Sequence, residues 1–143
     1  MDRVCLEKAK EIVCRTDAVF AYVSHSETIT SDKKGIGFVA SLCNDKRELS
    51  DGCAADKIVG RAAAFLFVFL GIKSVYAKTL SKGAACIFDE YGIEYEYETM
   101  TQAIVNRKGD GLCPMEMAVK DVNTPNEALD AVNRTLDNLR KQK

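Results

Sequence analysis

Histidine is nearly absent from this sequence, and its cysteines do not follow the spacing of a zinc or redox site. The only histidine, His25, lies in a predicted turn, so a metal site built from several histidines and a Ser-His-Asp triad are both excluded. The six cysteines include no C-x-x-C pair, which argues against a zinc knuckle or a thioredoxin-like motif. We therefore expect no metal and no cofactor.

Three further absences limit the location and the partners of the chain. The net charge is −1 and no basic block occurs, so we expect no nucleic-acid partner. The first residues lack the apolar core of a signal peptide, and the longest apolar run, 62–72, is too short to span a bilayer. These features predict a cytoplasmic chain with reduced thiols and no membrane contact.

What is present fits one α/β domain over residues 1–143. Hydrophobic residues make up 47% of the chain and charged residues 29%, which is an ordinary globular mixture. The pattern predicts a helix to about residue 15, with Asp2 as its cap, and then a β-hairpin over 18–31. A short helix near 38–43 follows, and the order strand, helix, strand, helix then implies a mixed sheet that is antiparallel at one side and parallel further in.

The centre of the predicted fold is a helix over 53–70, with Ser50 or Asp51 as its cap and a strand over 74–79 behind it. The second half of this segment is apolar all round and is expected to be buried. Ser81 is predicted to cap the next helix, and the alternating tyrosines and glutamates of 93–98 indicate a strand near a sheet edge. A capping box at Thr124 opens a last helix to about residue 140.

The first candidate site is the charged front of the 53–70 segment. On a helix, Lys57 and Arg61 share one face, where two like charges repel each other unless an anion lies between them. We therefore interpret Lys57 and Arg61 as ligands for a phosphate or carboxylate, with Asp56 beside them. The alternative is that both cations pair with glutamates of the 93–98 strand.

The second candidate site is the stretch 106–116, where basic residues and glycines precede a Cys-Pro-x-Glu sequence. Pro114 fits the first position of a short helix, which makes Cys113 its cap. A thiol at a helix start is stabilised as the thiolate, so Cys113 is a candidate nucleophile and Glu116 a candidate base. The alternative is that Glu116 is only a capping carboxylate and Cys113 only a packed thiol.

These two stretches carry a resemblance to a known family. Ala55-Asp56-Lys57 with Gly60, and Asn106-Arg107 followed by Cys113-Pro114 and Glu116, resemble a bacterial and archaeal family of unknown function that is placed in the cytidine deaminase-like superfamily. The resemblance covers nearly the whole chain and implies a three-layer α/β/α sandwich with a mixed sheet. The zinc-deaminase motifs H-x-E and P-C-x-x-C are missing at the expected positions, which read 54–57 and 80–83 here.

The resulting hypothesis is a metal-independent, deaminase-like domain that binds a small anionic, nucleotide-like metabolite. The predicted site comprises three candidate catalytic residues and five candidate ligand-binding residues: Cys113, Glu116 and Asp56; and Lys57, Arg61, Ser81, Asn106 and Arg107. Two alternatives stay open, a zinc-dependent nucleoside deaminase and a non-catalytic interaction module that uses the strand of Glu94, Glu96 and Glu98. Self-association into a homo-oligomer is expected by analogy with the superfamily.

Overall fold

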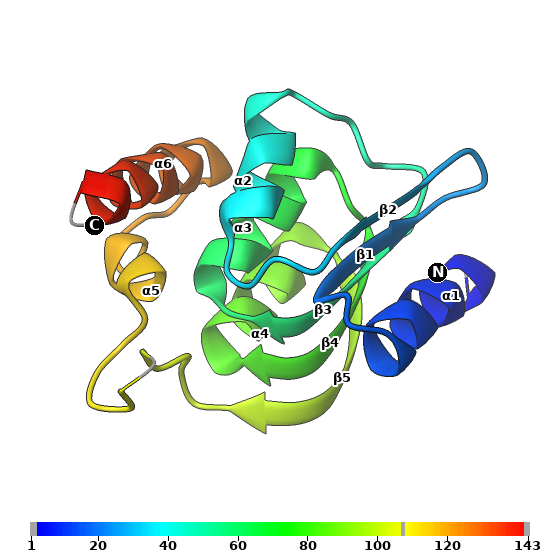
Figure 1. The fold of residues 1–143 in the computed structure, drawn as a ribbon, viewed down its shortest axis with the longest axis horizontal. Coiled ribbons are helices and arrows are strands. Elements are labelled where there is room, and N and C mark those ends of the chain that lie inside the picture. Colours follow the sequence, from blue (N-terminus) through cyan, green and yellow to red (C-terminus); the bar gives the residue numbers. More distant parts are fainter. Residues whose placement is uncertain (1–2, 107, 142–143) are drawn as a thin grey trace.

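A computed structural model describes residues 3–106 and 108–141 (Figure 1). The predicted cap Asp2 and the predicted ligand Arg107 lie outside the described residues. The elements in chain order are α1 (Arg3–Arg15), β1 (Phe20–Val23), β2 (Thr28–Ser31), α2 (Gly37–Asn44), β3 (Cys53–Val59), α3 (Arg61–Leu70), β4 (Ser74–Ser81), α4 (Lys82–Tyr91), β5 (Glu94–Thr101), α5 (Pro114–Ala118) and α6 (Pro125–Lys141).

The strands form one mixed sheet in the order β2-β1-β3-β4-β5. β1 pairs antiparallel with both β2 and β3, whereas β3, β4 and β5 run parallel. The prediction of a mixed sheet with its antiparallel part at one side is therefore confirmed. β5 lies at the sheet edge, as the alternation over 93–98 predicted.

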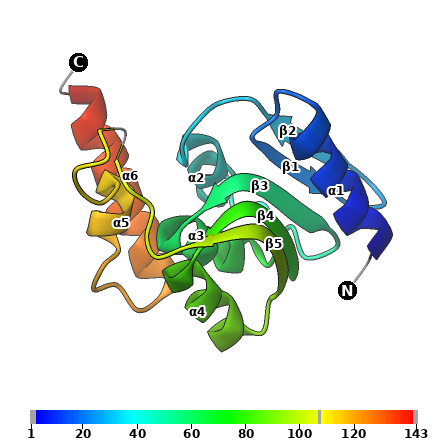
Figure 2. The ribbon, with the colours of Figure 1, turned by 90° about the horizontal axis from the view of Figure 1, so that it is seen from below.

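The helices cover the two faces of the sheet unequally. Figure 2 shows α1 alone on one face and α3 and α4 on the other, with α5 and α6 beyond the strand ends. The larger core cluster joins α2, α3, α4 and α6 to the sheet, and a smaller cluster joins α1 to β1, β3 and β4. This arrangement is consistent with a three-layer α/β/α sandwich.

The prediction of one continuous helix over 53–70 is wrong. Residues Cys53–Val59 form β3, between β1 and β4, and the helix begins only at Arg61. Gly60, in an extended conformation, separates the two elements. The small residues at the start of β3 have a propensity that also allows a helix. They form a strand because they lie between two other strands of a buried sheet. Neither Ser50 nor Asp51 caps a helix, because both precede β3.

Helix ends were predicted more accurately from local signals. The Ser81 hydroxyl accepts a hydrogen bond from the Ala84 N–H at 3.0 Å, so Ser81 caps α4 as expected. The Thr124 hydroxyl accepts from the Glu127 N–H at 3.2 Å and caps α6. Gly71 ends α3 with φ of 82° and Gly92 ends α4 with φ of 71°, both in the left-handed region that favours glycine.

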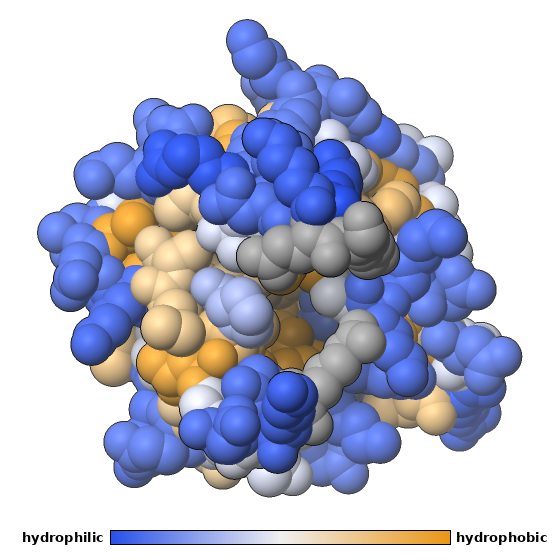
Figure 3. All heavy atoms as spheres, turned by 60° about the vertical axis from the view of Figure 1, so that its left-hand side comes forward, coloured by the Kyte–Doolittle hydropathy of each residue, from blue (hydrophilic) through white to orange (hydrophobic). Residues whose placement is uncertain are grey.

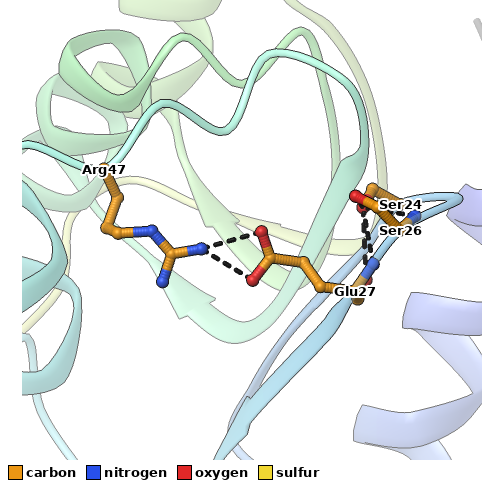
Figure 4. Close-up of polar contacts among 4 residues, drawn as sticks. All are labelled: Ser24, Ser26, Glu27 and Arg47. Carbon is orange, nitrogen blue, oxygen red and sulfur yellow. Dashed lines mark hydrogen bonds and ion pairs between the residues drawn. The ribbon is translucent and has the colours of Figure 1, made fainter.

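The hairpin turn is tied to the loop that leads into β3. The Ser24 hydroxyl accepts hydrogen bonds from the Ser26 and Glu27 N–H groups, which closes the turn around His25. Figure 4 shows Arg47, from the loop after α2, donating one Nη2 group to both carboxylate oxygens of Glu27 at 2.6 and 2.7 Å. This contact fixes the loop of residues 45–52 against the hairpin.

Two general findings bear on the predictions from composition. In the part of the chain that the structure describes, no helix is long and apolar enough to cross a bilayer. Cys5, Cys43 and Cys53 are buried, Cys113 is half-buried, and Cys14 and Cys86 are exposed. Three of the six cysteines are therefore small core residues.

We expect the Phe67→Ala variant to lose about 3–5 kcal/mol of unfolding free energy. Phe67 is fully buried, and its ring lies 6.1 Å from that of Phe20 and 6.5 Å from that of Phe88, so truncation leaves a cavity between the sheet and α4. Urea unfolding followed by circular dichroism measures the loss. The control Ile58→Thr changes an exposed β-branched residue of β3 and is expected to stay within about 0.5 kcal/mol of wild type. Equal losses in the two variants would contradict this assignment of the core.

Candidate functional site

Three helices begin at the edge of the sheet where the parallel strands end. β2 and β3 are both antiparallel to β1, so β2, β3, β4 and β5 all end at the same edge. The helices that follow, α2, α3 and α4, therefore begin there (Figure 1). Ligands of open α/β sheets bind preferentially outside the carboxyl ends of the strands. The predicted site residues that the structure describes divide into two groups. One group lies near the starts of α3, α4 and α5, and the other consists of Asp56 and Lys57 on β3.

Glu116, from α5, binds the start of α3. Its Oε1 accepts the Arg61 N–H at 2.7 Å and its Oε2 accepts the Ala62 N–H at 2.9 Å. Both hydrogen bonds are charge-assisted and lie at the positive end of the α3 dipole. The interpretation of Glu116 as a capping carboxylate is therefore supported, although the helix it caps is α3 rather than its own.

Gly60 makes this contact possible. A Cβ atom on Gly60 would overlap the Glu116 carboxylate and would lie 2.9 Å from Ile104 Cγ1. The φ angle of Gly60 is −101°, so the need for glycine here comes from close approach and not from backbone conformation. The absence of a side chain at Gly60 thus leaves room for the Glu116 carboxylate, although the two residues are distant in the sequence.

Arg61 is engaged with the connection between α5 and α6. Its Nε donates to the Val119 carbonyl at 3.2 Å and its Nη2 to the Val122 carbonyl at 2.5 Å, while the guanidinium lies over the Phe65 ring. Arg61 does not share a helical face with Lys57, because Lys57 lies in β3. The alternative pairing of Arg61 with the glutamates of the 93–98 strand is not observed, because its guanidinium donates to backbone carbonyls.

Ser81 and Cys113 lie near this contact, and both occupy helix starts. A Cβ placed on Gly83 would lie 3.6 Å from Arg61 Cβ and 3.8 Å from Ser81 Oγ, so the starts of α3 and α4 are close together. Cys113 is the N-cap of α5, and its N–H donates to the Ile104 carbonyl at 3.0 Å. No side-chain hydrogen bond caps α5, and the Cys113 thiol is half-buried.

Asn106 is part of a closed loop rather than an open phosphate cradle. Its Nδ2 donates to Asp110 Oδ1 at 2.8 Å, and its N–H donates to the Gly111 carbonyl at 2.8 Å. A bridge between Val105 and Leu112 continues this pairing. The loop therefore satisfies the Asn106 side chain internally.

Asp56 lies apart from the Glu116 contact, on the face of the sheet that α2, α3 and α4 cover. It pairs with Phe20 across the antiparallel register and with Ala77 across the parallel one, and both neighbours belong to the larger core cluster. Its Oδ1 accepts the Ile58 N–H at 3.3 Å. Burial raises the pKa of the Asp56 carboxyl to about 7, well above its ordinary value of 3.8.

Lys57 is directed away from Asp56. Consecutive residues of a strand point to opposite faces, so the Lys57 side chain leaves the sheet on the α1 face. The neighbouring residues Asp56 and Ile58 pair with Ala77 and Thr79 of β4, and the Lys57 N–H donates to the Val19 carbonyl at 3.0 Å. The predicted grouping of Asp56 and Lys57 on one helix start is therefore replaced by two side chains on opposite faces of one strand.

The start of α2 is a feature that the sequence reasoning did not assign to a site. Phe38, in the first turn of α2, has its ring centroid 5.9 Å from that of Phe20, which is the cross-strand partner of Asp56. The first turn of α2 therefore packs on Phe20 of β1, one strand away from Asp56. Within the described residues no side chain caps α2, in contrast to α3 and α4.

The sequence carried a signal for this feature. Lys33 and Lys34 precede α2 and are exposed, and a Cβ on Gly35 or Gly37 would meet nothing within 4 Å. Basic residues followed by two glycines with open space around them are typical of a backbone that a ligand can approach. The sequence of residues 33–37 indicates the start of a loop, but it does not indicate which strand the following helix packs against.

Neither of the two pockets described on this structure contains any of the predicted site residues. The larger one lies at the opposite edge of the sheet, where the parallel strands begin. The other lies between α1 and the hairpin. Among residues 3–106 and 108–141, no group of three or more His, Cys, Asp or Glu side chains is close enough to hold a metal ion.

Two comparisons with known proteins found a match. Residues 8–136 match a family model described as "TM1506: Domain of unknown function (DUF1893)". The crystal structure of a DUF1893 family protein (TM1506) from Thermotoga maritima is similar over 94% of this chain and 91% of that chain, with a TM-score of 0.85 and 26% identity. A comparison with curated proteins found no match.

We expect Gly60→Ala and Glu116→Ala to be coupled. Gly60→Ala displaces the carboxylate from α3 and is expected to cost about 1–3 kcal/mol of unfolding free energy. Glu116→Ala removes the cap and is expected to cost about 1–2 kcal/mol. In the double variant the alanine at 60 has no carboxylate to displace, so the two losses should not add. A double-mutant cycle by urea unfolding measures the coupling, and strictly additive losses would contradict the contact.

The raised pKa of Asp56 predicts a pH-dependent stability. Between about pH 4 and pH 7 the folded state keeps a proton on Asp56 that the unfolded state has lost, so its contribution to stability falls as the pH rises through this window and then levels off. Asp56→Asn removes the ionisation, so this variant should gain stability relative to wild type from pH 4 to pH 8. Urea unfolding at several pH values measures the difference.

The control for the Asp56 experiment is Asp130→Asn, which removes the same charge from an exposed position of α6. It should follow the wild-type profile. A stability difference between Asp56→Asn and wild type that does not change with pH would refute the raised pKa of the Asp56 carboxyl.

Proposed function

We propose that this chain, which belongs to the DUF1893 family of domains of unknown function, binds a small anionic, nucleotide-like metabolite at the carboxyl edge of its sheet. The observation that carries the proposal is the start of α2, which no side chain of the described residues caps and whose Phe38 packs on Phe20, the register partner of Asp56. Burial raises the pKa of the Asp56 carboxyl, one strand away, to about 7.

The three long helices that begin at this edge differ in what their first N–H groups bind. At α3 two of these groups bind Glu116, and at α4 one binds Ser81. At α2 no side chain of the described residues takes this role. Helix starts are favourable sites for phosphate and carboxylate groups. The Glu116 contact supports the proposal by analogy within the molecule, because it is a carboxylate bound by paired N–H groups at a neighbouring helix start.

Charge near α2 favours an anion. Lys33 and Lys34 directly precede α2, and both are exposed. Lys57 lies on β3 next to Asp56 but on the other face of the sheet, so its contribution would be a longer-range attraction at the same edge. Arg61, Ser81 and Asn106 are held by internal hydrogen bonds and are not required by the proposal.

The surface at this side of the molecule supports a ligand with an apolar part. Figure 3 brings forward the side on which α5 and α6 lie, and it shows hydrophobic surface near the centre, with hydrophilic side chains further out. The combination of an apolar floor with a few polar groups is typical of small-molecule sites. A protonated Asp56 can donate a hydrogen bond to a ring nitrogen or carbonyl oxygen of such a ligand.

We also propose that the domain belongs to the cytidine deaminase-like superfamily and that Cys113 acts as a nucleophile. The mixed sheet with helices on both faces agrees with the α/β/α sandwich that a cytidine deaminase-like fold requires. The position of Cys113 at the start of α5 supports a role for its thiolate as a metal-independent nucleophile. The zinc-dependent alternative would be favoured by stoichiometric zinc in elemental analysis of the purified protein.

Calorimetric titration with cytidine 5′-monophosphate, inorganic phosphate and cytidine tests the binding proposal. We expect the monophosphate to bind wild type, and its Kd to rise at least about tenfold in Lys33→Ala/Lys34→Ala, because two cations near the phosphate are lost. The Kd for Asp56→Asn should rise less and should no longer change between pH 6 and pH 8. Lys57→Ala measures the long-range contribution.

The matched control is Lys8→Ala/Arg15→Ala, which removes two exposed cations from α1 on the opposite face of the sheet. This variant should bind like wild type. Absence of binding of all three compounds to wild type, or equal Kd values for the two double variants, would overturn the proposal.

A further inference from the structure

β5 forms one edge of the sheet, and its outer side is open. The strand covers Glu94–Thr101 and pairs with β4, and within the described residues no strand pairs with its other side. Figures 1 and 2 both show that the chain leaves the end of β5 toward α5 and does not run back along the strand. Proline and lysine, which commonly protect edge strands from pairing, are absent from β5.

The pairing with β4 determines which backbone groups of β5 point outward. The Glu94 N–H donates to the Lys73 carbonyl at 3.0 Å, where the ladder between β4 and β5 begins. In a parallel ladder, alternate residues of a strand bond to one neighbour, and the residues between them turn their N–H and C=O groups to the other side. The backbone of Glu96 therefore faces β4, whereas Tyr95 and Tyr97 present their N–H and C=O groups at the open edge.

The side chains of Tyr95 and Tyr97 provide an apolar surface on one face of this edge. The Tyr95 ring lies 5.6 Å from the Phe88 ring of α4, and the Tyr95 hydroxyl donates to Asp89 Oδ1 at 3.0 Å. The Tyr97 ring stacks on the Tyr95 ring with the centroids 6.3 Å apart, and Tyr97 is 46% exposed. An exposed ring that packs on a fixed one offers contact area to the side chains of an added strand.

The opposite face of β5, on the α1 side of the sheet, carries carboxylates. Glu96 Oε1 pairs with Arg3 of α1, and Glu98 Oε2 accepts the Tyr76 hydroxyl at 3.1 Å. Each of these contacts uses one oxygen, and an ionised carboxylate has about four acceptor positions, so both glutamates can also bind cations of an added strand. Opposite charges across two strands stabilise the pairing, and like charges directly opposite each other destabilise it.

A second copy of this chain fits the edge poorly. Two β5 strands related by a two-fold axis would pair antiparallel, with residues of the same face opposite each other. Because the glutamates of β5 occupy alternate positions, the registers centred on residues 96, 97 and 98 all place a glutamate opposite a glutamate. The charge pattern therefore favours a different chain with cations at alternate positions.

From these observations we infer that the open edge of β5 binds an extended segment of another protein, which joins the sheet as a further strand. The segment alternates apolar side chains opposite Tyr95 and Tyr97 with lysine or arginine side chains opposite Glu96 and Glu98. Backbone hydrogen bonds provide affinity in this mode of recognition, and the alternating side chains provide specificity. The inference develops the interaction strand that the sequence left as an alternative, and it does not depend on the proposed anion site.

NMR titration of the ¹⁵N-labelled protein with three acetylated and amidated heptapeptides tests the inference. The first alternates lysine and valine, the second alternates glutamate and valine, and the third is the lysine peptide with proline in place of the central valine. We expect saturable shifts at the Tyr95 and Tyr97 amides with the first peptide and none with the second. The proline peptide should bind at least about tenfold more weakly, because its central residue has no N–H to donate to β5.

Variants of the protein link the response to the edge. Tyr97→Pro removes the outward N–H at a position where an edge strand tolerates proline, and it should weaken binding of the lysine peptide at least about tenfold. Glu96→Gln/Glu98→Gln should weaken it severalfold. The matched control Glu48→Gln/Asp130→Asn removes two charges from exposed positions outside β5 and should leave Kd unchanged.

The amide spectrum of each variant shows directly whether it is folded. If Tyr97→Pro does not fold, the glutamate double variant and the proline peptide still decide the question. The inference is overturned if the lysine peptide gives no saturable shifts at β5, if the glutamate peptide binds as tightly, or if the control variant weakens binding as much as Glu96→Gln/Glu98→Gln. A dimer of the protein alone in sedimentation equilibrium that Tyr97→Pro abolishes would also overturn it, because the occupant would then be a second copy.

Discussion

The contact between Glu116 and the start of α3 is the constraint on which the arrangement of this chain depends. It connects the C-terminal third of the sequence to the central strand-helix unit, and it requires glycine at position 60, because any larger residue would occupy the place of the carboxylate. Arg61 strengthens the same connection from the other side by binding two carbonyls beyond α5. Through these bonds the segment that follows β5 is held against the start of α3.

The parallel strands give the molecule two chemically different edges. α2, α3 and α4 begin at one edge and, after crossing the same face of the sheet, end at the other. Helix starts favour anions and helix ends favour cations, so one layer of helices creates opposite preferences at the two ends of the sheet. The proposed anion site at the start of α2 follows this polarity, because no side chain of the described residues caps that helix.

Local signals in the sequence were sufficient where a few neighbouring residues decide the structure. The caps at Ser81 and Thr124, the left-handed glycines at 71 and 92, and the alternation along β5 each depend on short-range sterics and hydrogen bonding, and all were predictable. The element over 53–59 was not, because small residues tolerate both helix and strand, and only the neighbouring strands decide between them. That one error moved Asp56 and Lys57 from a helix start to opposite faces of a strand, and it separated Lys57 from Arg61.

The sequence by itself therefore determined the class of the fold, the order of most elements and the edge position of β5. It also identified Gly60 and the Cys-Pro-x-Glu stretch among the residues that carry the family resemblance. Only the tertiary structure decided what those residues do. It paired Gly60 with Glu116 across 56 positions of the chain, engaged Arg61 with distant carbonyls, and packed the start of α2 on Phe20 of β1. The physical reason is that hydrogen-bond partners and burial are properties of segments brought together by folding. The sequence specifies which donors, acceptors and apolar side chains are available, but not which of them come into contact in the folded chain.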